Sequence, residues 1–457
     1  MIILLIFCKI QKNNQKISCF LSKNILYYKG KRAFTRSYPK IRGLYHERSF
    51  DYLLDFGRGG TMIRAHKIRL YPNNKQATYF CKACGVARFT YNWGLSEWKR
   101  RYNAGEKVNA GLLSKELNAI KRERFPWMLE VTKCASAEAL RTNLNRALKN
   151  FFEKRTKFPV FHQKGCHDSF SVYNRHFSVE GMMVKIPKLG MVRIAEPLRF
   201  SGKIVGATVS KTADKWFIAI NVEIPDPEPI HTGGNLAVGV DLGVKTLATL
   251  SDGTVVSGPN ASRKYEQKLR RLNKELSRRN VRKKGETQSN NFEKTKRKLA
   301  RLHARIANIR LDATHKLTTA LVKKYDLIGI EKLNVKGMMA SHRMARFIAD
   351  NSFYEFRRQL EYKAPAAGTR VIAANVMYAS SKTCNVCGTK RKILSLDDRK
   401  WTCECCGAVH DRDVNAAINL RNYAVGYTVK ACGGLGEVTA PDETGIKRRR
   451  RKTSGKS

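Results

Sequence analysis

The chain has 457 residues, and its 88 Lys and Arg against 37 Asp and Glu give a formal net charge of +51. Such an excess excludes an ordinary soluble surface, which mixes both signs, and predicts a polyanionic partner: nucleic acid, with an anionic membrane surface as the alternative. No apolar run approaches the roughly 18 residues of a membrane-spanning helix, so we expect a soluble chain.

Residues 1–61 show neither a sustained periodicity nor a pattern of domain size. At Met62 the sequence changes to MIRAHKIRLYP, an alternating strand that ends at a proline. We therefore expect translation to start at Met62, which makes residues 1–61 a mis-start or a disordered extension. A genuine basic N-terminal arm is the alternative.

From about Asn73 to Lys154, apolar residues recur at steps of three and four, which predicts a helical module. Basic and aromatic side chains mix in its first part, a combination suited to phosphates and stacked bases. The candidates for nucleic-acid contacts are Arg88, Tyr91 and Asn92. Trp93 and Trp98 belong to the same stretch, but a place in the core is the favoured interpretation for both.

Residues 156–230 consist of short β-rich runs between Gly, Asp and Pro turns, which predicts a small β-barrel. PDPEP, at 225–229, reads as a stiff linker. From Leu236 onward, strands and helices alternate in an α/β layout. Between Arg263 and Asp312, basic residues outnumber acidic ones 18 to 5 while leucines keep helical spacing. This predicts a helical pair with one apolar seam and a basic outer surface.

Two strands of the α/β part end in a carboxylate: AVGVD ends at Asp241 and LIGIE at Glu331. A carboxylate at the end of a buried strand is normally paired or bound to a cation. Mg²⁺ suits such a set, and two ions about 4 Å apart can activate water and stabilise the leaving oxygen of a phosphodiester. Asp413, which opens the helical run DVNAAINL, is the third candidate. Asp411 competes with it, and for any single acid a salt bridge or a helix cap is the alternative.

Four cysteines form two pairs with a two-residue gap, separated by 15 residues, which predicts a closed structural zinc site. They are Cys384, Cys387, Cys403 and Cys406. Gly388 and Gly407 follow the pairs, as tight knuckle turns need. Cys405 is a spare cysteine. Cys81 and Cys84 have the same gap but no clear second pair, so a coincidence on a helix is favoured over a second metal site.

The order GVDLGVKTLATLSDG, IGIEKLNVKGM, SSKTCNVCG and WTCECCGAVHDRDVNAAINL resembles the TnpB (OrfB) proteins of insertion sequences. KIRLYPN, ARFTYNWGL and FFEKRTKFPVF extend the resemblance upstream, so it covers Met62 to about Tyr423. It implies a Mg²⁺-dependent, RNA-guided DNA endonuclease related to type V CRISPR effectors, with a guide RNA and target double-stranded DNA as partners and neither a membrane nor a small-molecule substrate. A binding protein that regulates transposition or transcription without catalysis, and a strand-joining transposase, are the alternatives.

The resemblance assigns the catalytic acids, which would hold two Mg²⁺ ions, to Asp241, Glu331 and Asp413 rather than Asp411, and the zinc to the four paired cysteines. It implies a cytoplasmic, nucleoid-associated prokaryotic protein. Further nucleic-acid contacts are expected at Lys264, Arg270 and Arg271. The expected fold is an RNase H-like (RuvC) nuclease domain with an inserted zinc ribbon, a helical recognition lobe and a β-barrel wedge domain. The expected ranges are a first wedge strand at 62–79, the recognition lobe at 80–155, the wedge at 156–232, the nuclease at 233–381 with a basic helical insertion at 260–324, the ribbon at 382–408, the last nuclease helix at 409–425 and a basic disordered tail at 426–457.

Overall fold

The computed structural model describes residues 60–173, 177–230, 236–280, 288–341, 344–395 and 397–431. The expectations for residues 1–59 and for the tail beyond 431 lie outside this part of the chain. None of the helices in these ranges combines the length and apolar character that crossing a membrane requires.

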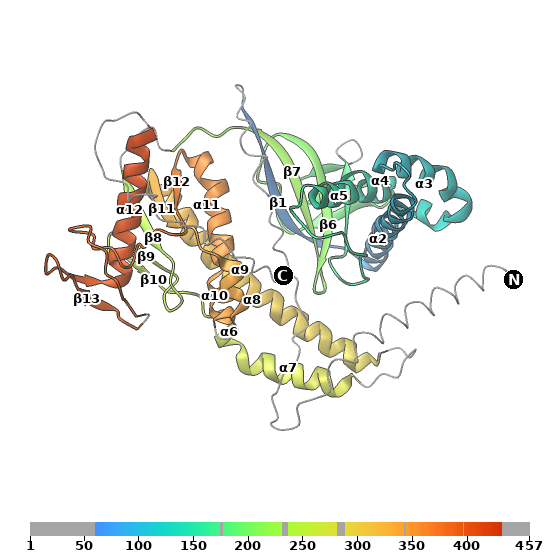
Figure 1. Ribbon diagram of the computed structural model, residues 1–457. Helices are drawn as coiled ribbons and strands as arrows, with labels where there is room; N and C mark the ends of the chain where they lie inside the picture. The colour runs from blue at the N-terminus through green and yellow to red at the C-terminus, as the bar shows by residue number, and fades with distance from the viewer. Residues whose placement is uncertain are drawn as a thin grey trace, which may run out of the picture. The chain divides into compact units, whose positions relative to one another are not determined.

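The N-terminal region begins with one strand, and a group of helices follows it, as the periodicity from 73 to 154 predicts. The elements are β1 (Thr61–Tyr71), α2 (Asn74–Asn103), α3 (Ala110–Arg124), the 3₁₀ turn η1 (Pro126–Glu130), α4 (Lys133–Glu138), the π-helical turn η2 (Ala139–Leu144) and α5 (Asn145–Phe152) (Figure 1). The helix α2 begins at a capping box. The side-chain oxygen of Asn73 accepts a hydrogen bond from the backbone N–H of Gln76, and the side-chain oxygen of Gln76 accepts one from the backbone N–H of Asn73.

β1 lies inside a seven-stranded antiparallel sheet with the order β2-β6-β7-β1-β5-β4-β3. The other strands are β2 (Ser169–Tyr173), β3 (Ser178–Glu180), β4 (Met183–Ile186), β5 (Gly190–Ile194), β6 (Lys203–Thr212) and β7 (Lys215–Pro225). Among the described residues no pairing joins the outer strands β2 and β3, so the expected closed barrel is replaced by an open sheet. Its apolar face does not need closure, because Phe80 of α2 packs on Phe170 and Trp216 and merges the helices and the sheet into one core.

The second sheet has five strands in the order β10-β9-β8-β11-β12. They are β8 (Ala237–Asp241), β9 (Ala248–Leu250), β10 (Val255–Val256), β11 (Leu327–Glu331) and β12 (Arg370–Ala374). The first three form an antiparallel meander, whereas β8, β11 and β12 are parallel. This mixed sheet, with helices between its parallel strands, fits the α/β layout that the alternation of strands and helices predicts.

Helices cover both faces of the five-stranded sheet. The helices of this region are α6 (Ala261–Lys264), α7 (Glu266–Arg279), α8 (Asn290–Lys324), α9 (Val335–Ala340), α10 (Ala345–Asn351), α11 (Phe353–Ala367) and α12 (Arg412–Ala431), and the short strands β13 (Lys400–Thr402) and β14 (Val409–Asp411) precede α12. Val238 and Val240 share a core with Leu321 of α8 and Phe356 of α11, while α12 packs on the opposite face (Figure 1).

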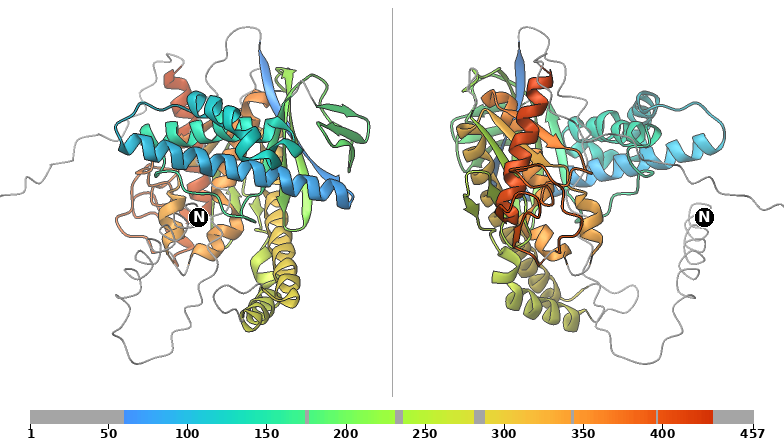
Figure 2. Two further views of the ribbon diagram at one scale, coloured as in Figure 1. Left: turned by 90° about the vertical axis from the view of Figure 1, so that its right-hand side faces the viewer. Right: turned by 60° about the vertical axis from the view of Figure 1, so that its left-hand side comes forward.

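Two sequence predictions about these helices have different outcomes. The helical pair is confirmed: α7 and α8 lie side by side (Figure 2), with Leu272, Leu299, Leu302 and Ile306 in one buried seam. The last helix, expected at 409–425, runs from Arg412 to Ala431 because residues 409–411 form β14, so the expected start is wrong and the expected tail is wrong over its first residues. Packing on the sheet still buries Ala424 completely, just before the expected end.

Two paired glycines set how closely α12 approaches the sheet. Gly239 of β8 is the register partner of Gly329 of β11. A Cβ atom at Gly239 would lie 1.8 Å from the backbone oxygen of Ala417, and one at Gly329 would lie 2.2 Å from that of Leu420. Because neither distance leaves room for a methyl group, the backbone of α12 rests directly on these two strands.

We expect Gly329→Ala to lower the free energy of unfolding by about 1–3 kcal/mol, because the added methyl group must push α12 away from the sheet. The measurement is denaturant unfolding of the purified protein. Gly426→Ala is the matched control, because a Cβ at that position of α12 meets nothing within 4 Å. Equal stability losses in the two variants would contradict the proposed role of the close approach.

Candidate active site

The acids that end β8 and β11 lie at the same edge of the five-stranded sheet. The strands are parallel, and Val240 is the register partner of Ile330, so Asp241 and Glu331 follow at adjacent positions. Asp413 lies in the first turn of α12, the helix that packs on these strands. Ligands of α/β sheets commonly bind at this carboxyl edge.

The electrostatics of Asp241 link the three acids. Burial is the largest cause that raises the pKa of Asp241, and the negative charges of Glu331 and Asp413 raise it further, to about 8, although Arg412 and Arg399 oppose them. Carboxylates that repel one another in this way favour a shared proton or a cation. Oxygen ligands of this kind suit a divalent ion such as Mg²⁺.

Two of the acids have neutralising or polar partners that the sequence did not reveal. The Ser380 hydroxyl donates a hydrogen bond to Oε1 of Glu331. Nη1 of Arg399 lies 3.0 and 3.2 Å from the two carboxylate oxygens of Asp413. Ser380 stands just before the first cysteine pair, in SSKTC, which is the only sequence signal for it; Arg399 has none beyond its position in the ribbon.

Asp411 and Asp413 differ in their hydrogen bonds. Oδ1 of Asp411 accepts from the backbone N–H groups of Asp413 and Val414, both at 3.1 Å, so Asp411 caps the N-terminus of α12. The charge of Asp413, in contrast, acts on Asp241. The cap explains why the sequence offers two acids two residues apart.

The loop that follows Asp241 is held from the end of α10. Nδ2 of Asn351 donates to the backbone oxygens of Gly243 and Val244, at 2.8 and 3.2 Å. The neighbouring Asp350 is ion-paired with Arg310 of α8 at 2.5 Å. Asp350 and Asn351 are both 5% exposed. Sequence reasoning missed this pair because its partners lie far away along the chain.

The four paired cysteines, which lie between β12 and α12 in the sequence, come together in space. Their sulfur atoms all lie within 4.8 Å of one another, and the shortest separations are 3.7 Å for Cys384 and Cys406 and 3.5 Å for Cys387 and Cys403. Metal–sulfur bonds of about 2.3 Å in a tetrahedron require sulfur atoms about 3.8 Å apart, so this set fits a tetrahedral metal ion.

The surroundings of the cluster agree with two knuckles. Gly388 and Gly407 have φ of +76° and +70°, and their N–H groups donate to the oxygens of Cys384 and Cys403, as the predicted tight turns require. Cys405 is exposed and does not belong to the set. Nε2 of His410 lies 3.0 Å from the sulfur of Cys384, a polar neighbour that the spacing did not predict.

The residues on α2 that the sequence suggested for nucleic-acid contacts are used within the protein. Tyr91 is 5% exposed and stacks on His162, with ring centroids 3.8 Å apart. Asn92 exchanges two hydrogen bonds with the backbone of His162, and Arg88 is paired with Asp168 at 3.2 Å. These side chains therefore fasten residues 162–168 to α2. The core interpretation of Trp98 is confirmed, because it is also buried.

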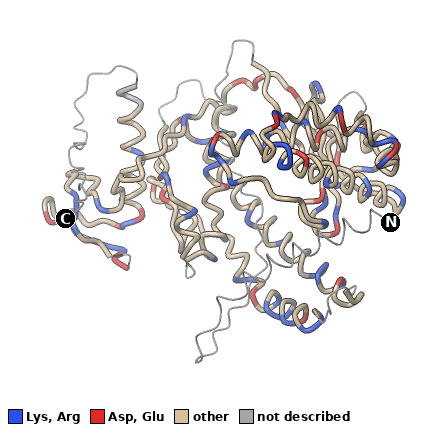
Figure 3. Tube along the Cα trace, turned by 45° about the vertical axis from the view of Figure 1, so that its right-hand side comes forward, with Lys and Arg blue, Asp and Glu red and all other residues tan. Residues whose placement is uncertain are grey.

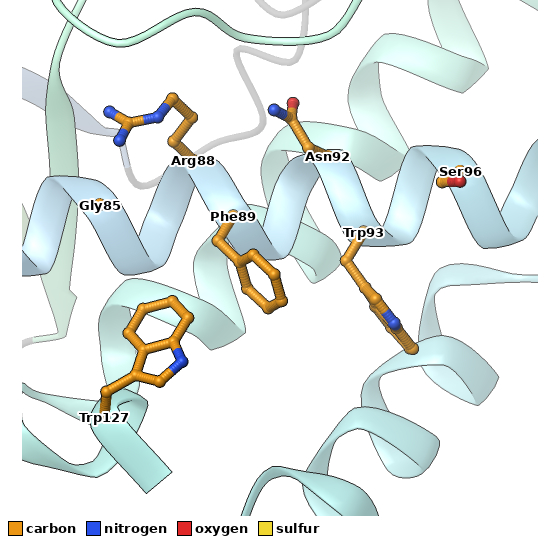
Figure 4. Close-up of a pocket in the computed structure, with 7 residues that line it drawn as sticks. All are labelled: Gly85, Arg88, Phe89, Asn92, Trp93, Ser96 and Trp127. Carbon is orange, nitrogen blue, oxygen red and sulfur yellow. The ribbon is translucent and has the colours of Figure 1, made fainter. Parts of the chain in front are cut away.

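A surface hollow of about 620 Å³ lies beside the same helix (Figure 4). Its lining consists of Gly85, Arg88, Phe89, Asn92, Trp93, Ser96 and Trp127. The rings of Phe89 and Trp127 meet edge to face, with centroids 5.1 Å apart. The hollow is thus aromatic on one side, while the polar ends of Arg88 and Asn92 point away from these rings.

Arg270 and Arg271 lie on the exposed surface of α7, and Lys264 is the exposed last residue of α6, just before that helix. Arg270 pairs with Glu266 one turn earlier, at 2.7 Å, and Glu266 also binds Arg346 at 2.9 Å. Lys and Arg recur along the pair in Figure 3. The predicted basic outer surface is therefore present, and each of the four acids that the structure describes between residues 263 and 312 is ion-paired.

Family models match three parts of the chain. The one described as "Probable transposase" matches residues 219–342, the one described as "Cas12f1-like, TNB domain" matches residues 353–420, and the one described as "Helix-turn-helix domain" matches residues 62–107. The last range is one strand followed by one continuous helix in this structure, namely β1 and α2.

Whole-length relatives agree with these matches. "Putative RNA-guided DNA endonuclease InsQ" of Escherichia coli (strain K12) is 35% identical over 390 residues, which cover 82% of this chain and 94% of that protein. "Putative RNA-guided DNA endonuclease" of Streptomyces pristinaespiralis is 35% identical over 378 residues, with 81% of this chain and 91% of that protein covered. The chain belongs to the TnpB (OrfB) family of insertion-sequence proteins, as its motifs predict.

A solved structure supports the fold. The chain in "Cryo-EM structure of the Cas12f1-sgRNA-target DNA complex" superimposes with a TM-score of 0.52 at 15% identity, covering 79% of this chain and 99% of that one. At this identity the likeness concerns the fold alone.

The raised pKa of Asp241 predicts how stability depends on pH in Mg²⁺-free buffer. The folded protein keeps a proton on this group up to about pH 8, whereas the unfolded chain releases it near pH 3.8. Stability therefore falls as pH rises between these values, by at most about 1.4 kcal/mol per pH unit from this one group. Denaturant unfolding between pH 5 and 8 should show a shallower decline for Asp241→Asn than for the wild type. Parallel curves would argue against the shift.

Proposed function

We propose that this protein is a Mg²⁺-dependent, RNA-guided DNA endonuclease in which Asp241, Glu331 and Asp413 hold two magnesium ions. The observation that carries the proposal is that Asp241 and Glu331 end adjacent parallel strands while Asp413 opens the helix packed on them. Burial, followed by the charges of Glu331 and Asp413, raises the pKa of Asp241 to about 8. When bound, magnesium would supply an activated water and stabilise the leaving oxygen of the cleaved phosphodiester. The names of the full-length relatives give the substrate and the guide.

The chain's own residues have distinct tasks in this proposal. Asp241 and Glu331 present their carboxylates from adjacent strands, and Asp413 presents its own from the start of α12. Arg399 is ion-paired with Asp413, and its guanidinium is the cation that we propose for a DNA phosphate. Asn351 fixes the loop after Asp241 so that its carboxylate stays at the strand edge.

The remaining regions fit the handling of guide and target. We propose that the helices from α2 to α5 are the recognition lobe and that the open sheet of strands β1 to β7 is the wedge. The basic surface of α7 and α8 suits the sugar–phosphate backbone of a guide–target heteroduplex, which is recognised by charge and shape while base pairing reads the sequence. The contacts proposed there are Arg270 and Arg271 of α7, together with Lys264 at the end of α6.

We further propose that the four-cysteine cluster binds one structural zinc ion. All four ligand positions are filled by sulfur, which leaves none open for a substrate or a water. The ribbon also carries Arg399, so zinc would hold the segment that brings this arginine to Asp413.

The test of catalysis compares two neighbouring acids. Asp413→Asn should lower guided DNA cleavage in Mg²⁺ by about three orders of magnitude, since losing a metal ligand removes several kcal/mol of transition-state stabilisation. Asp411→Asn should cleave at nearly the wild-type rate, because asparagine caps a helix about as well as aspartate. The measurement is single-turnover cleavage of a duplex that matches the co-purified guide RNA.

Guide-RNA and target binding, measured by filter retention, should be unchanged in both asparagine variants and in Asp241→Ala. Wild-type cleavage by Asp413→Asn or Asp241→Ala would refute the assignment of the acids. A wild-type protein that binds both nucleic acids and cuts neither would favour the regulator without catalysis.

Zinc content can be tested with a matched pair of cysteines. Cys403→Ser should lose the zinc ion, because it removes one of four ligands, and the melting temperature should fall with it. Cys405→Ser, two residues away and outside the cluster, should retain one zinc per chain. Elemental analysis of the purified proteins measures this, and equal zinc in both variants would contradict the ligand set.

A further inference from the structure

Glu331 is held by a serine that lies outside both the sheet and α12. Ser380 follows β12 and is 2% exposed, so its hydroxyl has almost no access to water and must use a protein acceptor. That acceptor is Oε1 of Glu331. A hydroxyl that donates to a carboxylate forms one of the stronger hydrogen bonds in proteins.

Ser380 itself is fixed by α12. Nδ2 of Asn419 donates to the backbone oxygen of Ser380 at 2.8 Å and to that of Thr383 at 2.7 Å, and Nδ2 of Asn415 donates to the same two oxygens at 3.4 and 2.8 Å. Both asparagines are at most 4% exposed. The turn is closed further by the N–H of Thr383, which donates to Ala379 at 3.1 Å.

The same asparagines reach the first cysteine knuckle. Oδ1 of Asn415 accepts from the N–H of Asn385 at 3.0 Å, directly after Cys384. A continuous set of hydrogen bonds therefore runs from the start of the cysteine cluster, through α12 and Ser380, to Glu331. The helix that carries Asp413 thus also sets the orientation of a second acid.

We propose that Ser380 is the positioning residue for Glu331: its hydroxyl occupies one oxygen and keeps the carboxylate turned so that its remaining lone pairs face a divalent cation. The inference rests on the proposed function, because it assumes that Glu331 is a metal ligand. The last torsion of a glutamate side chain is only weakly constrained, so without this bond the carboxylate can rotate.

The expected effect is on metal affinity rather than on nucleic-acid binding. Loss of a hydrogen-bond partner that orients a metal ligand typically costs about 10- to 100-fold in affinity or activity. Ser380→Ala should therefore weaken Mn²⁺ binding by about this factor and raise the Mg²⁺ concentration for half-maximal cleavage in proportion. Binding of the guide RNA should not change.

The experiment uses the full-length protein with its guide RNA and titrates Mn²⁺, detected by electron paramagnetic resonance, alongside cleavage at increasing Mg²⁺. Ser381→Ala, which removes a hydroxyl from the next residue of the same turn, is the matched control and should behave as the wild type. Ser380→Cys keeps nearly the same volume and a weaker donor, so it should fall between wild type and Ser380→Ala. If Ser380→Ala melts at a much lower temperature than the wild type, Ser380→Cys replaces it in the comparison.

The outcomes separate the two proposals. If Glu331→Ala loses Mn²⁺ and cleavage while Ser380→Ala and Ser380→Cys keep wild-type metal affinity, the role of Ser380 is refuted and the active site stands. If Glu331→Ala itself binds Mn²⁺ and cleaves as the wild type does, the proposed function fails. Equal weakening in Ser381→Ala and Ser380→Ala would also overturn the inference, because the effect would then belong to the turn as a whole.

Discussion

The close approach of α12 to the five-stranded sheet is the constraint on which the candidate site depends. It is possible only because Gly239 and Gly329, paired across β8 and β11, have no side chains where the helix backbone passes. With the helix seated there, its first turn brings Asp413 to the edge where β8 and β11 end. Its next two turns bring Asn415 and Asn419 to the turn that contains Ser380.

That geometry brings the negative charges of three acids near one another, and the neighbouring residues offset this repulsion only in part. Burial, followed by the charges of Glu331 and Asp413, raises the pKa of Asp241, and this is the cost of the arrangement. Arg399 and Arg412 offset some of the repulsion, and the Ser380 hydroxyl binds one oxygen of Glu331. A region that remains short of positive charge, in a protein with a net charge of +51, is a favourable place for a divalent cation.

Two parts of the cysteine ribbon, the first knuckle and the segment between the knuckles, contact this site. Its first knuckle is tied to α12 through Asn385 and Asn415, and the segment between the knuckles carries Arg399 to Asp413. The capping acid Asp411 ends β14, the last strand of the ribbon, and starts the helix. The folding of the ribbon therefore affects the acids through these hydrogen bonds and this ion pair.

The sequence alone determined the features whose signals are local. Strand-end acids, the cysteine spacing and the leucine seam of α7 and α8 are set by neighbouring residues, because side-chain periodicity and knuckle geometry repeat over a few positions. Only the tertiary structure decided what depends on distant partners. The seven-stranded sheet stays open because α2 covers its apolar face. Tyr91 is buried because His162 stacks on its ring. Asp411 became a cap, and Ser380 and Arg399 reached the acids, because contacts across the fold, not spacing, bring these groups together.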